Sequence, residues 1–517
     1  MPAHTDLLSP DIPPELFLQI FRFLDAKSLV RCCSVCHVWN DLIRDTIELQ
    51  YSIELLAEGM VQEPSVPGCD PNRDLHALLT RRRAWQTLAW TSKVTVDVEP
   101  LTRGAWELAG GIFIQHQPRN SSILSVAFSR DQDPTTELTQ PSPQAIRDFR
   151  DLALDPTQDL LVRFYAVSGD SEHAHLHFVC RTISTDQPHP LAAHSTLCLS
   201  LDRDVRDTYF SMQIAEDIVC VFYYKPPFTF HIINWKKGIR VVHLMPDRSV
   251  GVLGVTDIHL LTPRSFIGID TSPYATVDSG RIDVFTFDGE HPNPPTLIAT
   301  FELPKTFPGK NLVNAKIFAG AYCANTGSVV TPPPPPFLKS NESRIFMLHL
   351  RHAVNHWFWL FVPFHVFHKY VADAADDGPR LVLWDEWGST HSRMLAGSAR
   401  NMYRAVHGSR VALPFGERQS GLVQILDFGA TIQRSAALAN PDIPSSSADF
   451  QVRLHTGPSN IPSADYVFLS TITTTLPYLS AVRKLAPGND IFLLDQDRLC
   501  AMNSATGNTG QMTVYTF

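Results

Sequence analysis

The sequence lacks the short motifs that mark the common classes of enzyme. It contains no Gly-x-Ser-x-Gly, no phosphate-binding Gly-x-x-x-x-Gly-Lys, no His-Glu-x-x-His and no dinucleotide-binding Gly-x-Gly-x-x-Gly. Each of these motifs holds a nucleophile, a phosphate group or a metal in one geometry. Their absence favours a protein that is not an enzyme, and we expect neither a cofactor nor a bound metal.

Signals for export and membrane insertion are also missing. The first residues contain neither a basic segment nor an apolar one, as a secretory signal would. The longest apolar run, 357–367, is about half of the roughly twenty residues that cross a bilayer, and it contains Pro363 and His365. We interpret this run as a buried strand pair and expect no membrane partner.

Charge and cysteine content narrow the protein class further. The formal net charge is −9, which does not favour nucleic acid or an anionic membrane surface as the main partner. Nine cysteines without a dense framework suit a reducing compartment. We therefore expect the protein in the cytoplasm and/or the nucleus, without a nucleic-acid partner.

Near the N-terminus, apolar residues are denser than a surface helix requires. Residues 16–24 include only two polar positions, whereas a helix with one buried face needs roughly three apolar positions in seven. The apolar positions form two rows along a helix, separated by about 100°. One row can pack inside the domain, and the other needs a partner. The rows are Leu16, Ile20 and Phe23, and Phe17, Phe21 and Leu24.

Residues 11–43 as a whole resemble an F-box. They begin with Asp-Ile-Pro-Pro-Glu-Leu, where Ile12 replaces the usual Leu, and continue through Val35-Cys36, Trp39 and Leu42-Ile43 at the family's spacing. The resemblance implies a three-helix domain that binds the Skp-type adaptor of a cullin-RING ubiquitin ligase. It also implies which residues form or support the adaptor surface, namely Ile12, Pro13, Leu16, Ile20, Leu24, Leu29, Val35 and Trp39.

The periodicity divides the chain into three parts. We assign residues 8–50 to the F-box, 51–90 to a helical linker, and 91–517 to an all-β region that binds the substrate. Within the linker, Arg81, Arg82 and Arg83 form a basic run. Such a run is usually a solvated face or covers neighbouring carboxylates, and we do not interpret it as a nucleic-acid site.

The β-region consists of short apolar or alternating runs separated by turn residues, for example 110–114, 218–224 and 423–428. Units of four strands and roughly 60 residues predict a β-propeller of about seven blades, although no Gly-His…Trp-Asp repeat is present. The combination is similar to fungal F-box families with a degenerate propeller-like region. The alternative is two β-sandwich domains, divided at the proline-rich interval 326–340.

The propeller interpretation makes two local predictions. Residues 512–517 contain strand-forming types, and we expect them to close the propeller by pairing within the blade formed by 491–494 or with a strand within 91–115. The sequence His173-Ala-His-Leu-His177 has the alternation of a strand. We interpret its histidines as a solvent-facing row opposite Ala174, Leu176 and Phe178, rather than as metal ligands.

Together these patterns predict a non-catalytic substrate receptor of an SCF-type ubiquitin ligase. Its F-box would bind the Skp-type adaptor, and through it a cullin, while the β-region would hold an unidentified protein substrate. Two alternatives come from other classes. One is an F-box scaffold without a degradation substrate, and the other is a β-propeller hydrolase with carboxylates scattered over its loops.

Overall fold

The computed structural model describes most of the chain. The described residues are 13–62, 70–101, 104–118, 122–128, 134–139, 149–168, 173–201, 205, 208–224, 228–244, 255–271, 280–322, 336–353, 356–373, 378–399, 404–417, 419–429, 450–463, 467–503 and 510–517.

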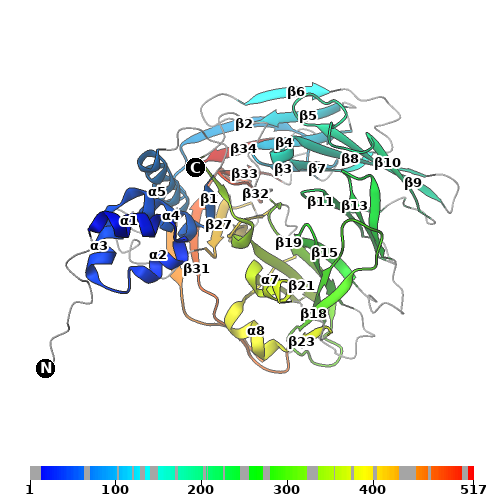
Figure 1. The fold of residues 1–517 in the computed structure, drawn as a ribbon. Helices are drawn as coiled ribbons and strands as arrows, with labels where there is room; N and C mark the ends of the chain where they lie inside the picture. The colour runs from blue at the N-terminus through cyan, green and yellow to red at the C-terminus, as the bar shows by residue number, and fades with distance from the viewer. Residues whose placement is uncertain are drawn as a thin grey trace.

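Five helices precede the β-region and lie beside it (Figure 1). Pro14 is the first residue of α1, where its missing N–H leaves no intrahelical bond unmade. Asp25 caps α2, because its Oδ1 accepts from the backbone N–H of Ser28 at 2.7 Å. Gly59 ends α4 in the left-handed conformation that glycine adopts without strain. The helices are α1 (Pro14–Arg22), α2 (Ala26–Cys32), α3 (His37–Asp45), α4 (Ile47–Glu58) and α5 (Pro71–Thr87).

The first three helices fall within the predicted F-box. The boundary that we placed between residues 50 and 51 lies inside α4, which runs without a break from Ile47 to Glu58. The three-part division of the chain stays a prediction. Among the described helices, none combines the length and the apolar character needed to cross a membrane.

The β-region is a seven-bladed β-propeller whose blades surround a common centre (Figure 1). Strands are antiparallel within each blade, except that β23 adds to blade 4 in parallel. From the centre outwards the strands are, in blade 1, β3 (Trp106–Ala109), β4 (Ile112–Gln117), β5 (Ser122–Ala127) and β6 (Thr135–Thr139); in blade 2, β7 (Phe149–Asp155), β8 (Leu160–Ser168), β9 (Ala174–Thr182) and β10 (Thr196–Leu201); in blade 3, β11 (Phe210–Ala215), β12 (Ile218–Tyr223), β13 (Thr229–Asn234) and β14 (Ile239–Leu244); in blade 4, β15 (Val255–Thr262), β16 (Ser265–Asp270), β17 (Arg281–Thr286), β18 (Thr296–Glu302) and β23 (Arg380–Val382); in blade 5, β19 (Leu312–Phe318), β21 (Ile345–His352), β22 (His356–Pro363) and β24 (Arg393–Ala396); in blade 6, β25 (Val406–His407), β26 (Arg410–Phe415), β27 (Leu422–Asp427), β31 (Tyr478–Lys484) and β28 (Phe450–His455); and in blade 7, β32 (Ile491–Leu494), β33 (Arg498–Met502), β34 (Gly510–Thr516) and β2 (Ser92–Val98).

A few elements lie outside this scheme. Two helices follow strands of the propeller, and there are two short strand pairs, one of which joins segments far apart in the sequence. They are α7 (Phe364–Ala372), α8 (Trp384–His391), β1 (Met60–Gln62) paired with β20 (Phe337–Lys339), and β29 (Ser459–Ile461) paired with β30 (Ile472–Thr474).

The central strands of the blades are apolar on both faces because each blade packs between two others. Along β12, Val219 and Val221 join the core shared with blade 2, whereas Cys220 and Phe222 join the core shared with blade 4. Successive side chains of a strand point to opposite faces. A blade strand therefore appears as a continuous apolar run in the sequence rather than as a polar and apolar alternation.

The propeller closes by joining segments that are far apart in the sequence. Strand β34 pairs with β33 on one side and with β2 on the other, so that Val514 lies opposite both Cys500 and Val94. Both predicted partners of 512–517 lie in this blade, and the closure is confirmed. The arrangement removes an open sheet edge at the point where the ring is joined.

Two interpretations from the sequence are wrong. Residues 357–367 form a strand followed by a helix rather than a strand pair, because Pro363 ends β22 and is the N-cap of α7. The sandwich alternative fails because β19 and β21, on either side of the interval 326–340, pair in one sheet. Most of that interval, including residues 326–335, lies outside the described residues.

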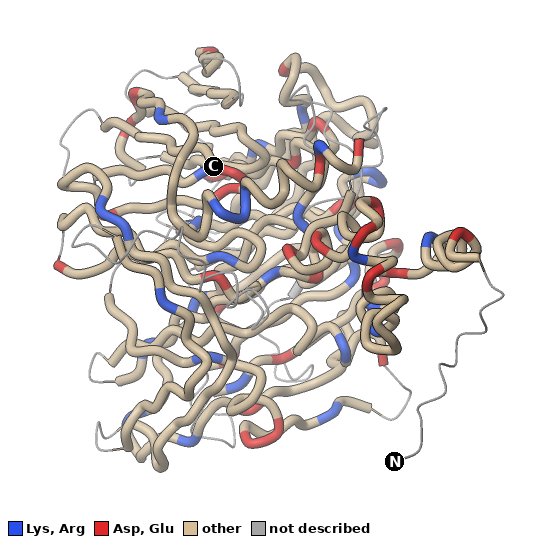
Figure 2. Tube along the Cα trace, turned by 90° about the vertical axis from the view of Figure 1, so that its left-hand side faces the viewer, with Lys and Arg blue, Asp and Glu red and all other residues tan. Residues whose placement is uncertain are grey.

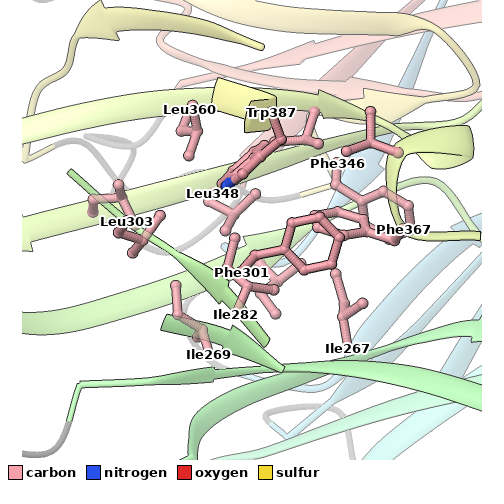
Figure 3. Close-up of a cluster of buried hydrophobic side chains, with 14 of the residues drawn as sticks. Ile267, Ile269, Ile282, Phe301, Leu303, Phe346, Leu348, Leu360, Phe367 and Trp387 are labelled. Atoms are coloured by element: carbon pink, nitrogen blue, oxygen red, sulfur yellow. The ribbon is translucent and has the colours of Figure 1, made fainter. Parts of the chain in front are cut away.

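Helices α7 and α8 cover an apolar core between blades 4 and 5 (Figure 3). The ring of Phe301 makes edge contacts with Phe367 of α7 and Trp387 of α8, at centroid distances of 5.2 and 5.4 Å. Ile282 and Leu348 from the facing blades lie in the same cluster. Phe367 and Trp387 therefore contribute to the core between the two blades although neither belongs to a strand.

Candidate functional site

The structure of the N-terminal helices shows which of the two apolar rows faces outwards. Phe21 is buried, and Phe17 and Leu24 pack against the same small core. The other row is open to solvent, with Leu16, Ile20 and Phe23 exposed by 48%, 55% and 91%. We call Leu16, Ile20 and Phe23 the exposed row. An uncovered line of three large apolar side chains is the usual mark of an interaction surface.

The exposed row is held in place by a compact core behind it. Leu29, Ile43 and Leu49 are buried, and the Trp39 ring makes an edge contact with Phe21 at a centroid distance of 5.4 Å. Aromatic pairs in this geometry add stability beyond the apolar area that they bury. The core therefore sets the direction of α1 although it contains few residues.

The structure assigns different environments to the residues that the F-box resemblance implies. Leu16, Ile20 and Val35 are strongly exposed, as direct contacts would be, and Pro13 is also exposed. Leu29 is buried, which suits only a supporting role. Leu24 and Trp39 are half-buried, and Ile12 lies outside the described residues. Their roles in adaptor binding stay a prediction.

Helix α5 is packed onto blades 6 and 7 through aromatic contacts. The rings of Trp85 and Phe517 stack with centroids 4.0 Å apart. The guanidinium of Arg410, in blade 6, lies 4.7 Å from the centroid of the Trp85 ring. Ala84 and Leu88 belong to the same cluster. We call these contacts of the linker with blades 6 and 7 the junction.

Buried ion pairs reinforce the junction. Arg81 Nε lies 2.5 Å from Asp497 Oδ1, and both side chains are 5% exposed. Glu58 Oε2 lies 3.6 Å from Arg410 Nη2 of blade 6, with both side chains buried. Arg82 joins α5 to α4 instead, because its Nε lies 2.5 Å from Glu58 Oε1 and its second nitrogen contacts Glu54. The interpretation that the basic run covers neighbouring carboxylates is confirmed for Arg81 and Arg82.

A short strand near the end of the proline-rich interval completes the junction. Strand β20 pairs with β1 of the linker, and Lys339 at its end is buried. Lys339 Nζ donates to the backbone carbonyl of Glu58 at 2.7 Å. Burial lowers the pKa of Lys339 to about 7. Aromatic stacking, ion pairs and this strand pairing together hold the linker against the propeller.

A cavity of about 250 Å³ lies at the centre of the propeller. Its lining comes from the strands next to the centre in blades 1 to 6 and from residues beside them. Most of the aromatic, charged and amide side chains that line the cavity are aromatic rings or carboxyl groups. The full set of these side chains is Trp106, Glu107, Asp151, Phe210, Gln213, Tyr224, Asp257, His259, Lys316, Phe318 and Arg404. We call this the central cavity.

Two carboxyl groups of the central cavity, those of Asp151 and Asp257, have raised pKa values. Burial raises the pKa of Asp151 to about 7 and the pKa of Asp257 to about 6. Asp257 accepts from the Tyr224 hydroxyl at 2.8 Å and from the Ile317 N–H at 2.7 Å. Burial also lowers the pKa of His259 to about 3, so its imidazole is neutral near pH 7. Perturbed groups in a cavity are characteristic of binding and catalytic sites.

The histidine row of blade 2 takes the orientation that its alternation predicted. Ala174, Leu176 and Phe178 are buried on one face of β9, whereas His175 is exposed and His177 is half-buried on the other. Within the described part of the chain, no group of three or more His, Cys, Asp or Glu side chains is placed to hold a metal.

The sequence analysis did not find the central cavity. Its polar residues come from six blades and are separated by about 300 positions between Glu107 and Arg404, so no local motif contains them. One signal was present in a single strand, because Asp257 stands within an otherwise largely apolar run from Val255 to Leu261. A charged side chain in a central strand needs a partner, a cavity or a ligand.

Comparison with known proteins bears on both parts of the chain. A family model described as F-box-like matches residues 9–54. The WD40 domain of SCAP from fission yeast shares 8% identity over 80% of this chain and 81% of its own, with a TM-score of 0.32. The C-terminal WD40 domain of Sif2 shares 10% identity over 82% of this chain and 97% of its own, with a TM-score of 0.35. A search of curated proteins gave no match.

The propeller is established by its own strand pairing, in which seven blades close through β2 and β34. The helices before it carry both the F-box-like match and an exposed apolar row. This combination is typical of adaptors without catalytic activity. The chain thus combines an F-box-like domain at residues 9–54 with a seven-bladed β-propeller-like region.

Proposed function

We propose that this protein is the substrate receptor of a cullin-RING, SCF-type ubiquitin ligase. In this proposal the F-box binds the Skp-type adaptor, and through it the cullin, while the propeller binds a protein substrate. The chain itself performs no chemical step. It positions the substrate for ubiquitin transfer by other subunits.

The exposed row carries the proposal. Leu16, Ile20 and Phe23 lie along one side of α1, while Val35 and Val38, exposed by 63% and 56%, lie just before and within α3. Removing such side chains from water stabilises a complex by about 25 cal/mol for each Å² buried, less the cost of association. A helix pair with this much uncovered apolar surface is suited to a partner of the same character, as an adaptor groove would provide.

The junction supports the receptor role in a second way. A receptor must hold its substrate at a constant position relative to the ligase, and a mobile linker would not do so. Here Trp85 stacks on Phe517 and Arg81 is paired with Asp497 in a buried site. A force or a rotation applied at the F-box is therefore transmitted to blade 7 rather than absorbed in the linker.

The proposal includes a protein partner rather than nucleic acid or a membrane, in the cytoplasm and/or the nucleus. Lysine and arginine are interspersed with aspartate and glutamate along the described trace (Figure 2). The described cysteines carry free thiols, as a reducing compartment would maintain. A propeller surface of mixed charge is suited to recognition of another protein through specific side chains.

Co-purification with the adaptor tests the proposal. Replacing Ile12 and Pro13 by Ala, or Leu16 and Ile20 by Ala, should abolish recovery of adaptor and cullin, because a central interface anchor contributes roughly 2 kcal/mol or more. The matched control is Leu191→Ala, which removes a side chain that is 57% exposed on blade 2. Recovery unchanged in both double variants would refute the assignment.

A second experiment separates a receptor from a scaffold. A receptor should accumulate a bound protein when the proteasome or the cullin is inhibited, and the Leu16→Ala, Ile20→Ala variant should accumulate it without inhibition. Quantitative mass spectrometry of the purified protein measures both. A set of partners that does not respond to inhibition would favour the scaffold alternative.

A further inference from the structure

The three carboxylates of the central cavity differ in the partners that they already have. Glu107 is paired with Arg404. Asp257 accepts from the Tyr224 hydroxyl and from two backbone N–H groups, those of Ile258 and Ile317. Both groups are therefore well satisfied within the protein.

Asp151 is different. Its carboxylate accepts from the backbone N–H of Leu152 at 2.9 Å and from that of Met212, and within the described part of the chain it pairs with no lysine or arginine. Burial without a cation is the reason that its pKa is raised to about 7. The cavity thus contains one carboxylate whose ionised form has no positive partner.

The wall around Asp151 is aromatic and opens to solvent. Trp106, Phe210, Tyr224 and Phe318 all line the central cavity and all are only half-buried. A cation over an aromatic face, next to a carboxylate, is held by two attractive terms in a partly desolvated site. An anion would be repelled by the same groups.

The protein already places one cation in this environment. Lys316 Nζ lies 5.0 Å from the centroid of the Tyr224 ring, and the Lys316 side chain is exposed. The Tyr224 ring face is therefore accessible to an alkylammonium group. Lys316 also shows that a second cation would approach a like charge, which limits its affinity.

From these contacts we propose that the central cavity binds a single cationic side chain of the substrate, an arginine guanidinium or a lysine ammonium, and that Asp151 is the carboxylate that pairs with it. The identification of the cation as part of a substrate rests on the proposed receptor function. A volume of about 250 Å³ lies just below the roughly 300–1,000 Å³ of pockets for drug-sized ligands, which suits one extended side chain.

Binding of small probes to the full chain, purified with the adaptor if the two associate, tests the proposal. The probes are N-butylguanidinium, its neutral isostere N-butylurea, and the capped pentapeptide Gly-Gly-Arg-Gly-Gly with a citrulline counterpart and a glutamate counterpart. Calorimetric titration should show saturable binding of the guanidinium and of the arginine peptide. It should show none for the urea, the citrulline peptide or the glutamate peptide.

Three variants locate the site. Asp151→Asn should weaken binding of the arginine peptide tenfold or more, because it removes the charge that pairs with the cation. Asp385→Asn, an exposed change on α8, is the matched control and should leave affinity unchanged. Lys316→Met should strengthen binding severalfold by removing the like charge. This exposed substitution keeps the test decisive if Asp151→Asn does not fold.

Several results would overturn the proposal. Equal binding of the arginine and citrulline peptides would show that charge is not recognised. Binding of free butylguanidinium without binding of the arginine peptide would identify a site for a small free cation rather than for a substrate side chain. An unchanged affinity in Lys316→Met would place the cation elsewhere. Adaptor recovery is measured separately, so failure of the receptor assignment and failure of this site are distinguished.

Discussion

The junction pairs its carboxylates with arginine, whereas the central cavity contains one carboxylate, that of Asp151, with no such pairing among the described residues. At the junction Asp497 is paired with Arg81 at 2.5 Å, and Glu58 lies 3.6 Å from Arg410 of blade 6. Among the residues that the structure describes, Asp151 accepts only from backbone N–H groups, and burial raises its pKa to about 7.

The difference separates a structural use of charge from a binding use. A buried pair is costly to break, because the remaining partner is then an uncompensated charge in a medium of low dielectric. A half-buried carboxylate such as that of Asp151, shielded from water without a paired cation among the described residues, instead lowers the stability of the folded protein near neutral pH. Such a loss of folding stability is retained most readily where binding of a ligand offsets it. The junction therefore fixes geometry, and the cavity is available for recognition.

The largest effect should come from removing the strand on which both the closure and the junction depend. A chain that ends after residue 509 loses β34, which leaves β2 and β33 without their shared neighbour and removes Phe517 from Trp85. We expect loss of the cooperative thermal transition. A protease site introduced within 332–336 is the control, and cleavage there should be tolerated. An unchanged melting temperature in the truncated chain would show that β34 is not needed for closure.

Breaking one ion pair of the junction should have the next largest effect. Arg81→Met leaves Asp497 buried without its cation and should lower the free energy of unfolding by about 3–5 kcal/mol. Adding Asp497→Leu should restore much of the loss, since both charges are then absent. Urea denaturation measures each variant, with the exposed Arg83→Met as control. A loss below about 1 kcal/mol for Arg81→Met would mean that the pair does not hold the junction.

The pH dependence of stability distinguishes the cavity from the junction. The pKa of Asp151 is raised from 3.8 to about 7 by burial, so the folded state retains its proton more strongly than the unfolded state. Stability must then fall as pH rises from about 4 to about 7. Asp151→Asn removes this term. Between pH 5 and pH 8 the wild type should lose about 2 kcal/mol more than the variant.

Thermal melts of both proteins over this pH range measure the difference, and parallel curves would contradict it. The wild type and the variant share the other titratable groups that line the cavity, so the comparison isolates Asp151. Those groups are Glu107 on β3, Tyr224 after β12, Asp257 and His259 on β15, Lys316 on β19 and Arg404 before β25.

The smallest effect should come from an ion pair that is not buried. Arg22 Nε lies 2.9 Å from Glu48 Oε2 between α1 and α4, with both side chains about half exposed. Arg22→Ala should lower the free energy of unfolding by less than about 1 kcal/mol, because water screens the pair. A loss as large as that of Arg81→Met would show that burial does not explain the difference between the two pairs.

The parts that sequence alone predicted are those with local periodicity. The two rows of α1 follow from residues within nine positions, and the seven blades follow from repeated short apolar runs. Which row faces outwards did not follow, because that depends on where Phe21 meets Trp39. The central cavity could not be predicted either, because its lining residues come from six blades and are far apart in the sequence.

Local errors had local causes. The predicted strand at 110–114 begins inside a hairpin, because Gly110 and Gly111 both adopt positive φ and connect β3 to β4. Two consecutive glycines are a strong turn signal between strands. Pro363 was likewise counted as an interruption within a strand pair, whereas it marks the change from β22 to α7. In both cases the glycine or proline residues determine where the strand ends or begins, although the residues around them are apolar.

The pairing of β2 with β34 has a consequence for the order in which the protein is made. Ser92 lies opposite Thr516, so β2 must wait for more than four hundred further residues before it finds its partner. At roughly 5–20 residues per second, that interval is about 20 to 85 s. During it the F-box-like helices have already left the ribosome, with their exposed row uncovered. Because Phe517 stacks on Trp85, the F-box acquires its final orientation only after synthesis has passed the last strand.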